Sequence, residues 1–384
     1  MSKKKQPPTS ESSPAIDPRN ESLADQLVAL ALDLRDTGDY AVLSDDMKKA
    51  RAELRKAIRI CLKEQREPAL AEALERTYEE DLQAHVVLRA NVEALSQNVI
   101  FRRDGGKDVE VDAFVVPLLV QTAGGLRSDQ CFQDEEAFER LRDSFQEEGL
   151  ESRKARVVLV SHAYHPEEIR RIGYCQLHAM VHEASDAMSR KRATAADAIA
   201  RSLSGWPPSE FAPEDKALEL RFLLGFSLKA LDDPFYQVPE KEAAADRYFE
   251  GRAERFRQWS QRVTPLLQRC LVTDGREARI DFLYQDLFHG GKAAAQAELD
   301  MLGLLAEVQQ MLEAGGVTAE SARAQLELAE GDDGPVLRVS LAAADGAALG
   351  EVEQPLDPAQ APEGAIADME DALMSIGIAS IQVV

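Results

Sequence analysis

The chain of 384 residues carries a formal net charge of −23 at pH 7, and 45% of its residues are hydrophobic while 29% are charged. A chain of this length exceeds one compact core, so we expect two or three lobes in an ordinary soluble globular protein. The strongly acidic charge argues against nucleic acid as the main partner, because binding to phosphate needs a clustered cationic surface.

The sequence shows no sign of export or of a membrane anchor. No apolar run approaches the roughly 20 residues that cross a bilayer, and the N-terminus lacks the apolar segment of a signal peptide. Four cysteines lie far apart, which is typical of reduced thiols in a core: Cys61, Cys131, Cys175 and Cys270. We therefore expect a cytoplasmic protein that has no membrane partner.

The first part of the chain is predicted to be a disordered tail followed by a helical lobe. Residues 1–20 are rich in proline, serine and lysine and have almost nothing to bury. Residues 21–97 show the apolar periodicity of four helices, and Gly38 is expected to end the first of them. Ser44 is a predicted N-cap of the second helix, and Pro68 suits the first turn of the third.

Residues 98–203 are predicted to form a first β/α half. Two strands, 98–103 and 109–121, are separated by turn residues and predict a β-hairpin. Pro117 is unfavourable in a central strand, so we expect an edge or a bulge at this position. Three further elements complete this half: a helix at 133–148, a strand at 155–161 and a helix at 166–189.

Residues 214–314 are predicted to form a second half. Six apolar residues alternate without interruption and predict a strand with one face toward a core: Leu218, Leu220, Phe222, Leu224, Phe226 and Leu228. A helix at 241–271, interrupted near Pro265, a strand at 277–284 and a helix at 292–313 follow. Because both halves run strand, helix, strand, helix, we interpret them as a structural repeat with a ligand cleft between its halves.

The last segment, residues 315–384, is predicted to be acidic and rich in strands. Three strands form a meander that a helix and a final strand close: 322–329, 335–343, 348–354, 364–376 and 378–384. Residues 313–384 hold 14 Asp and Glu against two Arg and no Lys, which favours solubility or a basic partner. The predicted fold class is α+β, with an N-terminal helical lobe, two related β/α halves with mixed sheets, and a C-terminal β-meander plus helix and strand.

One stretch, residues 156–189, holds the residues best suited to bind a metal ion. The candidate ligands are one cysteine and two histidines on a helix and two histidines at the preceding strand exit: Cys175, His178, His182, His162 and His165. Steps of three and four residues place the first three on one helix face, which is expected to point away from the core, and the set suits zinc. The spacing is not a specific zinc signature, and Arg171 on the same face opposes a cation, so a polar helix face is the simpler interpretation.

A glycine motif before the last helix of the second half is the other candidate site. His289, Gly290, Gly291 and Lys292 could bind an anion through glycine N–H groups at a helix N-terminus. The motif lacks the spacing of a P-loop or of a dinucleotide-binding loop, so a plain helix start after a turn is the simpler interpretation.

Four stretches carry a likeness to known proteins: LADQLVALALDLRDTG (23–38), VDAFVVPLLV (111–120), LVSHAYHPEEI (159–169) with His178 beyond it, and LELRFLLGFSLKALDDPFY (218–236). In these stretches the chain resembles a family of uncharacterised bacterial proteins of about 400 residues, known only as a domain of unknown function. The resemblance implies no catalytic residues. It directs attention to His162, Tyr164 and His178.

These observations favour a cytoplasmic binding or regulatory protein without chemistry of its own and without a cofactor, because no acid, base and nucleophile form a coherent set. Its partner would be an unidentified protein or a small-molecule ligand. One alternative is a metal-dependent, hydrolase-like enzyme that uses the Cys/His helix face, with zinc as its cofactor. The other is a binder of an anion or nucleotide in the cleft between the two halves.

Overall fold

The structure is a computed structural model that describes residues 17–35, 44–102, 108–122, 126, 132, 134–189, 218–271, 278–331, 334–357 and 361–384. Contacts between residues divide the chain into two compact units, residues 1–92 and 93–384, and each unit is described by itself. Within the described ranges, no helix combines the length and the apolar character that crossing a membrane requires.

The first unit is helical, as its apolar periodicity predicts. Its helices are α1 (Pro18–Leu32), α2 (Asp45–Lys63), α3 (Glu67–Glu80) and the beginning of α4 (Leu82–Gln97). Ser44 is the N-cap of α2, since its Oγ accepts a hydrogen bond from the N–H of Met47 at 3.2 Å. Residues 1–16 of the predicted disordered tail lie outside the described ranges, but residues 18–20 belong to α1, so that part of the tail prediction was wrong.

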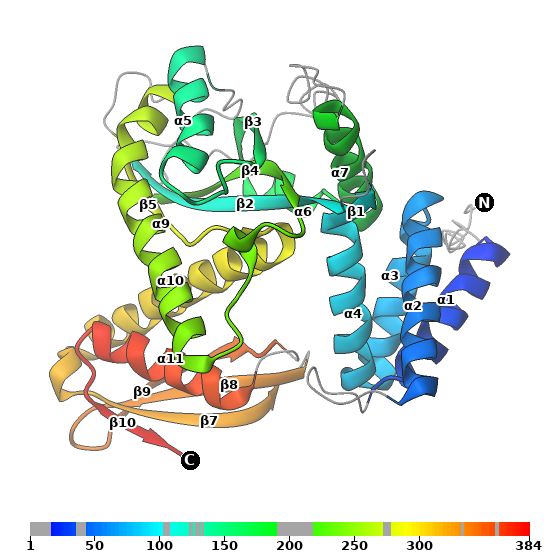
Figure 1. Ribbon diagram of the computed structural model, residues 1–384. Helices are drawn as coiled ribbons and strands as arrows, with labels where there is room; N and C mark the ends of the chain where they lie inside the picture. Colours follow the sequence, from blue (N-terminus) through cyan, green and yellow to red (C-terminus); the bar gives the residue numbers. More distant parts are fainter. Residues whose placement is uncertain are drawn as a thin grey trace, which may run out of the picture. The chain divides into compact units, whose positions relative to one another are not determined.

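The second unit is built on an antiparallel sheet whose central strand is β2 (Asp108–Thr122). Strand β4 (Leu218–Ala230) pairs with β2 along nearly its whole length, and β3 (Arg156–Tyr164) pairs with the outer edge of β4. Three short strands share the other edge of β2: β1 (Asn98–Arg102), β6 (Asp286–Leu287) and β5 (Ala278–Phe282). Figure 1 shows this sheet with helices on both sides.

Pro117 lies inside β2 and not on an edge strand, and the pattern of short strands explains why it is tolerated. Its carbonyl oxygen accepts a hydrogen bond from Leu283 at 3.0 Å, in the break between β5 and β6. Since the N and O of one residue point to the same side of an antiparallel strand, the missing N–H of Pro117 faces this break. The ladder between β2 and β4 therefore loses no hydrogen bond at this position.

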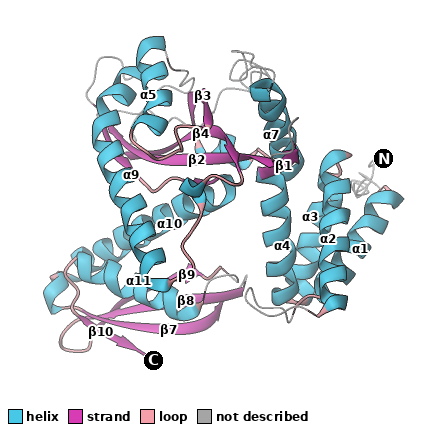
Figure 2. Ribbon diagram, viewed as in Figure 1, coloured by secondary structure: helices cyan, strands magenta, loops and turns pink. Residues whose placement is uncertain are grey.

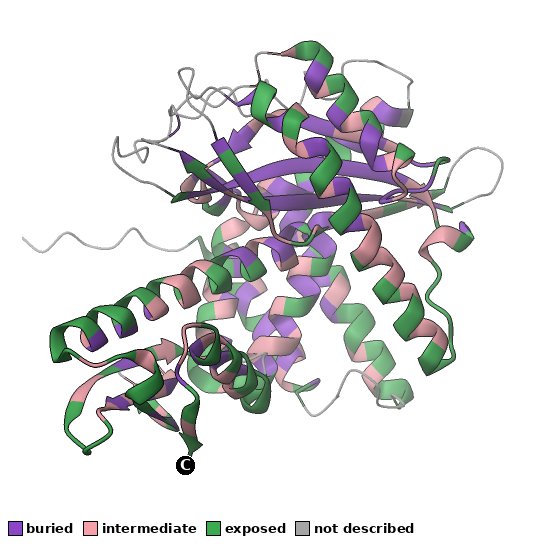
Figure 3. Ribbon diagram, turned by 90° about the vertical axis from the view of Figure 1, so that its left-hand side faces the viewer, coloured by how far each residue is buried: buried purple, intermediate pink, exposed green. Residues whose placement is uncertain are grey.

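Helices cover both faces of this sheet (Figure 2). One face packs against α5 (Glu135–Glu147) and α9 (Glu242–Cys270) through a core that includes Phe145 and Trp259. The other packs against α6 (Pro166–Arg170), α7 (Tyr174–Ser189) and the start of α10 (Phe288–Gly315). The long strands β2 and β4 are therefore largely buried on both sides, as Figure 3 shows. Helix α9 continues through Pro265, where the sequence predicts an interruption.

The α+β class is confirmed, but the interpretation of two separate halves with mixed sheets was wrong. Strand β2 from the first half and β4 from the second are neighbours in one antiparallel sheet. Because they are hydrogen-bonded to each other, no cleft separates these two strands in the described part of the chain. Periodicity identifies a strand and its buried face, but it does not identify the strand's partner.

The C-terminal part of the second unit forms its own sheet on the second half of α10. Strands β7 (Arg323–Gly331), β8 (Gly334–Ala342) and β9 (Ala348–Pro355) form the predicted meander. Helix α11 (Pro362–Ser375) follows, and β10 (Ser380–Val383) pairs with β7 in parallel. Apolar residues of α10 and α11 cover one face of this sheet: Leu304, Val308, Leu312, Met369 and Leu373.

Candidate functional site

Strand β4 carries polar residues on one of its two faces. The alternating apolar residues from Leu220 to Leu228 lie in the core beneath α7 and α10, as predicted. The opposite face, called here the polar face of β4, is turned toward α5 and α9 and is also largely buried, which the alternation did not predict. Along it lie Glu219, Arg221, Leu223, Gly225, Ser227 and Lys229. Burial of polar groups is unfavourable unless they are hydrogen-bonded or paired. The buried polar residues of this face are therefore candidates for a functional site.

Gly225 marks the middle of the polar face and is required there by close packing. A Cβ atom at this position would lie 2.3 Å from Cζ of Phe114, whose ring rests on the glycine. We expect Gly225→Ala to lower the free energy of unfolding by about 1–3 kcal/mol, because the ring must move within a packed core. Urea denaturation measures this change.

Gly303 provides the matched control for that substitution. It lies inside α10, and a Cβ atom there would meet nothing within 4 Å. Gly303→Ala is expected to leave stability unchanged or to raise it by up to about 1 kcal/mol, since alanine favours a helix. Equal effects of the two substitutions would contradict the close packing of Phe114 on Gly225.

The C-terminal end of the polar face holds a hydrogen-bonded network, the Lys229 network, which comprises Glu110, Asp112, Glu151, Ser227, Lys229 and Tyr236. The Lys229 Nζ atom contacts the Asp112 carboxylate and lies 4.9 Å from the centre of the Tyr236 ring. Oε2 of Glu151 accepts hydrogen bonds from Ser227 Oγ at 3.0 Å and from Tyr236 Oη at 2.7 Å. Among the described residues, no buried side-chain N or O atom of this network lacks a partner. Such a network is self-sufficient, which is typical of a structural role.

Asp112 makes this network sensitive to pH. Burial raises the pKa of its carboxyl group to about 6, although the Lys229 ammonium acts in the opposite direction. A raised pKa in the folded state stabilises the protein below pH 4, and this contribution is lost as the pH rises through 6. We expect the wild-type free energy of unfolding to fall between pH 4 and pH 7, by on the order of 2–3 kcal/mol from this group, and Asp112→Asn to remove that part.

A titration of the Asp112 carboxyl carbon by NMR checks the same assignment directly. The midpoint is expected near pH 6 in the wild type and higher in Lys229→Met, which removes the positive charge that favours ionisation. A midpoint near pH 4 in the wild type would show that the carboxylate is solvated and would contradict this prediction.

The N-terminal end of the polar face holds a buried ion pair with one open donor. Arg221 is 0% exposed, and its Nε and Nη2 atoms lie 3.2 and 2.8 Å from Oε2 of Glu219. The other carboxylate oxygen of Glu219 accepts a hydrogen bond from the N–H of Leu126 at 2.9 Å. In the described part of the chain, Nη1 of Arg221 has no hydrogen-bond acceptor. An unpaired buried donor is unfavourable by about 1–3 kcal/mol, and more for a charged group.

Strand β3 approaches this ion pair through a bulge. Its pairing with β4 shifts register between Leu159 and Ala163, so His162 lies among the residues that form the bulge. The Nε2 atom of His162 lies 3.4 Å from Oε2 of Glu168, and its ring meets the Tyr164 ring edge-on at 4.5 Å. Bulges often redirect side chains beside functional sites. Here the bulge provides a histidine on the side where the sheet meets α6.

His165 and Glu168 link the bulge to the start of α6. Nδ1 of His165 accepts a hydrogen bond from the N–H of Glu167 at 3.1 Å, and Glu168 accepts one from the N–H of His165 at 2.6 Å. Burial, followed by the positive charge of Arg221, lowers the pKa of His165 to about 4, so its ring is neutral at physiological pH. Because Nδ1 is an acceptor, the proton of the neutral ring is on Nε2.

Glu168 remains ionised in these surroundings. Burial opposes ionisation, but hydrogen bonds from His162 and from the backbone of His165 outweigh it and hold the pKa of Glu168 below its usual value. We call the set His162, His165, Glu168, Glu219 and Arg221 the Arg221 cluster. With His165 neutral, it combines one guanidinium with two carboxylates, while the Nη1 group of the guanidinium stays open.

The predicted metal ligands are not gathered into one site. His178 and His182 are neighbours, with ring centres 4.5 Å apart, whereas His162 contacts Glu168 and His165 caps α6. Within the described ranges, which include all five predicted ligands, no three His, Cys, Asp or Glu residues are placed to hold a metal ion. The expected outward face of α7 was also wrong, because Cys175 and His178 are buried and only His182 is exposed.

The predicted anion motif lies in the first turn of α10 and packs against the sheet. A Cβ atom on Gly291 would lie 2.5 Å from the Val115 side chain, and one on Gly290 would lie 2.2 Å from Oδ2 of Asp286. Gly291 therefore allows the helix to approach β2 closely, and Gly290 leaves room for the Asp286 carboxylate. The Asp286 carboxylate accepts a hydrogen bond from the N–H of Leu287 at 2.7 Å, so the protein's own negative charge occupies the helix N-terminus.

His289 of the same motif is buried and hydrogen-bonded. Its ring Nε2 lies 2.9 Å from Ser96 Oγ, and its N–H donates to Oε1 of Gln97 at 2.9 Å. These contacts tie the start of α10 to the end of α4. They are contacts typical of a histidine in a protein core.

Sequence reasoning missed Glu168, Glu219 and Arg221. The available signal was a glutamate and an arginine two residues apart on a strand, which places both on one face. Their apolar neighbours on the other face dominated the pattern. The two histidines of the Arg221 cluster, His162 and His165, were singled out from the sequence, although for metal binding.

Comparison with known proteins gives one matching protein family. No curated protein and no solved structure matches the chain. A family model described as "Protein of unknown function (DUF2863)" matches residues 14–347, which include the Arg221 cluster and the Lys229 network but not α11. This match confirms the resemblance to a domain of unknown function. The match spans most of the sequence, and the chain therefore belongs to the DUF2863 family.

Proposed function

We propose that this protein binds a small molecule through a carboxylate group, which accepts a hydrogen bond from Nη1 of Arg221, and that it acts as a binding or regulatory protein. The observation that carries the proposal is the open donor of a fully buried guanidinium. At the other end of the same strand face, within the described ranges, no buried side-chain N or O atom of the Lys229 network lacks a partner. The contrast supports a ligand at the Arg221 end.

The charges of the Arg221 cluster favour a carboxylate over a phosphate. Glu219 already engages Nε and Nη2 of Arg221, and Glu168 adds a second negative charge nearby. The two carboxylates would repel a dianionic phosphate more strongly than a singly charged carboxylate, which needs only one donor group. Neutral His165, with its proton on Nε2, adds polarity without a charge that changes between pH 5 and pH 8.

Thermal denaturation in the presence of defined anions tests this proposal. Acetate, pyruvate, succinate and inorganic phosphate are the probes, at concentrations up to 20 mM and at constant ionic strength. We expect at least one carboxylate to raise the Tm in a saturable way, because a ligand that binds only the folded state stabilises it, by about 2.7 kcal/mol at 100 times its Kd. Phosphate is expected to have the smaller effect.

The double variant Glu219→Gln/Arg221→Met separates binding from folding. It removes both charges of the ion pair together and is expected to fold and to lose the response to carboxylates. Arg338→Met is the control, since Arg338 pairs with Glu353 on the other sheet of this unit and is expected to keep the response. A response that persists in the double variant, or no response to any carboxylate in the wild type, would disprove the proposal.

A further inference from the structure

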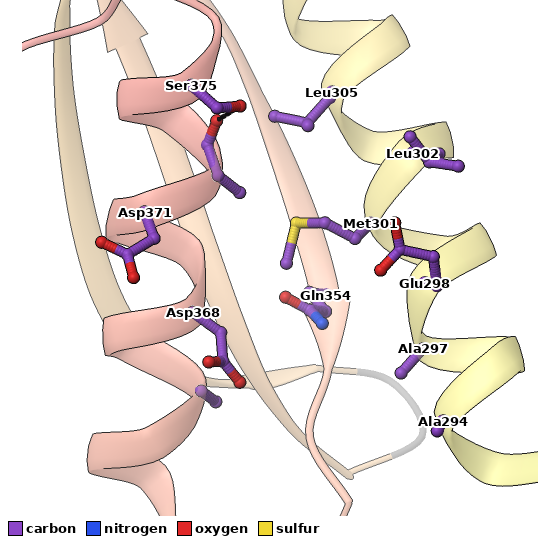
Figure 4. A pocket seen from close by; sticks show the side chains of 12 residues that line it. Ala294, Ala297, Glu298, Met301, Leu302, Leu305, Gln354, Asp368, Asp371 and Ser375 are labelled. Carbon is purple, nitrogen blue, oxygen red and sulfur yellow. Dashed lines mark hydrogen bonds between the residues drawn. The ribbon is translucent and has the colours of Figure 1, made fainter. Parts of the chain in front are cut away.

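Helices α10 and α11 enclose a groove that is separate from the Arg221 cluster. The groove has a volume of 590 Å³, and Gln354 of β9 lies at its floor (Figure 4). Residues of α10 form one wall and residues of α11 form the other. We call it the α10–α11 groove. Its α11 wall lies beyond the residues that the family model matches.

The groove has the length of a short helix. Its wall on α10 extends from Ala294 to Leu305 and its wall on α11 from Ala365 to Ser375, in steps of three and four residues that keep each wall on one helix face. At 1.5 Å per residue, each wall is roughly 15 Å long, which is about three helical turns. Figure 4 shows Ser375 and Leu305 at one end of the groove and Ala294 near the other.

The lining combines apolar side chains with negative charge. Met301, Leu302 and Leu305 provide the apolar surface, and small alanines on both walls leave the space open. Among the described residues, the ionisable ones in the lining are Glu298, Asp368 and Asp371, and none of them is Lys, Arg or His. The surrounding segment 313–384 has a formal charge of −12, which adds to the negative charge of the groove.

We propose that the α10–α11 groove docks a basic amphipathic helix of a partner protein. Apolar side chains of that helix, at steps of three, four and seven residues, would lie against Met301 and Leu302, and its lysines or arginines would meet Glu298, Asp368 and Asp371. The volume is far larger than a single cation needs. The carboxylates exclude acidic peptides and nucleic acid by repulsion.

A second copy of the chain is a poorer occupant than a partner protein. In the described part of the chain the basic helix is α2, whose exposed residues include Lys48, Arg51 and Arg59. The apolar residues of α2 are already buried in the first unit, among them Leu54, Ile58 and Leu62. Helix α2 therefore cannot offer an apolar face and a basic face to the groove at the same time.

The experiment uses the full-length protein and two fluorescent peptides of identical composition. One is a 14-residue peptide of leucine, lysine and alanine with leucines at helical spacing, and the other is a scrambled version without an apolar face. We expect fluorescence anisotropy to show at least tenfold tighter binding of the patterned peptide. Binding is expected to weaken between 50 and 200 mM salt, because charge contributes to it.

Two substitutions on the same helix locate the site. Ala297→Trp fills the groove and is expected to weaken binding of the patterned peptide at least tenfold, whereas Ala306→Trp, at an exposed position of α10 outside the lining, is expected to leave it unchanged. Circular dichroism verifies that both variants fold. The double variant Asp368→Asn/Asp371→Asn is expected to weaken binding and to reduce its dependence on salt.

Four results would overturn the proposal. Equal binding of the scrambled peptide would show that the peptides bind by unspecific charge attraction. Unchanged binding to the Ala297→Trp variant would show that the peptide binds outside the groove. Displacement of the peptide by spermidine at equal concentration would assign the groove to a small cation. Self-association of the wild type that Ala297→Trp abolishes, measured by sedimentation velocity, would assign it to a second copy.

Discussion

Arg221→Met is expected to lower the free energy of unfolding by about 3–5 kcal/mol, because it leaves the buried Glu219 carboxylate without its counter-charge. The two side chains are almost completely buried, so water cannot replace the lost guanidinium. Urea denaturation followed by circular dichroism measures the change. Arg338→Met, which breaks an exposed pair with Glu353, is expected to change stability by less than about 1 kcal/mol.

The double variant Glu219→Gln/Arg221→Met is expected to recover most of that loss. Replacing both members of a buried ion pair by uncharged residues of similar size is often nearly neutral, because the desolvation of two charges is also avoided. Glutamine keeps an acceptor for the N–H of Leu126. If the single and the double variant were equally unstable, the ion pair would not be the origin of the effect.

Trp259→Ala is the other substitution with a large expected effect. Trp259 is fully buried in α9, its Nε1–H donates to Ser144 Oγ at 2.8 Å, and its ring lies 4.9 Å from the Phe145 ring and 5.5 Å from the Phe282 ring. The substitution removes contacts with both α5 and β5. We expect it to lower the free energy of unfolding by about 3–5 kcal/mol, as for other large-to-small changes in cores.

Trp259→Phe is the matched control for the size of the side chain. It keeps an aromatic ring between α5 and β5 and loses the indole N–H, so the expected loss is smaller than for alanine. Both variants are compared by urea denaturation monitored through far-ultraviolet circular dichroism. A loss below about 1 kcal/mol for Trp259→Ala would mean that α9 is not held to the sheet by this residue.

Local sequence patterns predicted the strand β4, but not its surroundings. The alternation from Leu218 to Leu228 identified a strand and one buried face. That both faces are buried follows from helices contributed by distant parts of the chain, α5 and α9 on one side and α7 and α10 on the other. Pro117 illustrates the same limit. The side of this residue that lacks an N–H faces the break between β5 and β6, which lies more than 160 residues later in the sequence.

The sequence identified the two histidines of the candidate site but not its arginine. His162 and His165 attract attention in any sequence, since few residue types bind metals or transfer protons. Arg221 is a candidate because it is buried and because, among the described residues, its Nη1 atom has no hydrogen-bond partner. Both properties depend on residues that are distant in the sequence. The mistaken outward face of α7 has a similar origin, because α7 contacts several strands of the sheet and its Tyr174 ring lies 5.2 Å from that of His289.

The long pairing of β2 with β4 also determines how this protein can fold. Its paired residues, from Gln121 with Leu218 to Val109 with Ala230, are separated by 97 to 121 positions. Such non-local contacts give a high contact order and slow folding, because the entropy of a large loop must be overcome before any contact is gained. At about 5–20 residues per second, a ribosome that has completed β2 needs roughly 5–20 seconds to synthesise its main partner. During this interval β2 is an apolar strand with a vacant edge, the kind of nascent segment that chaperones protect from aggregation.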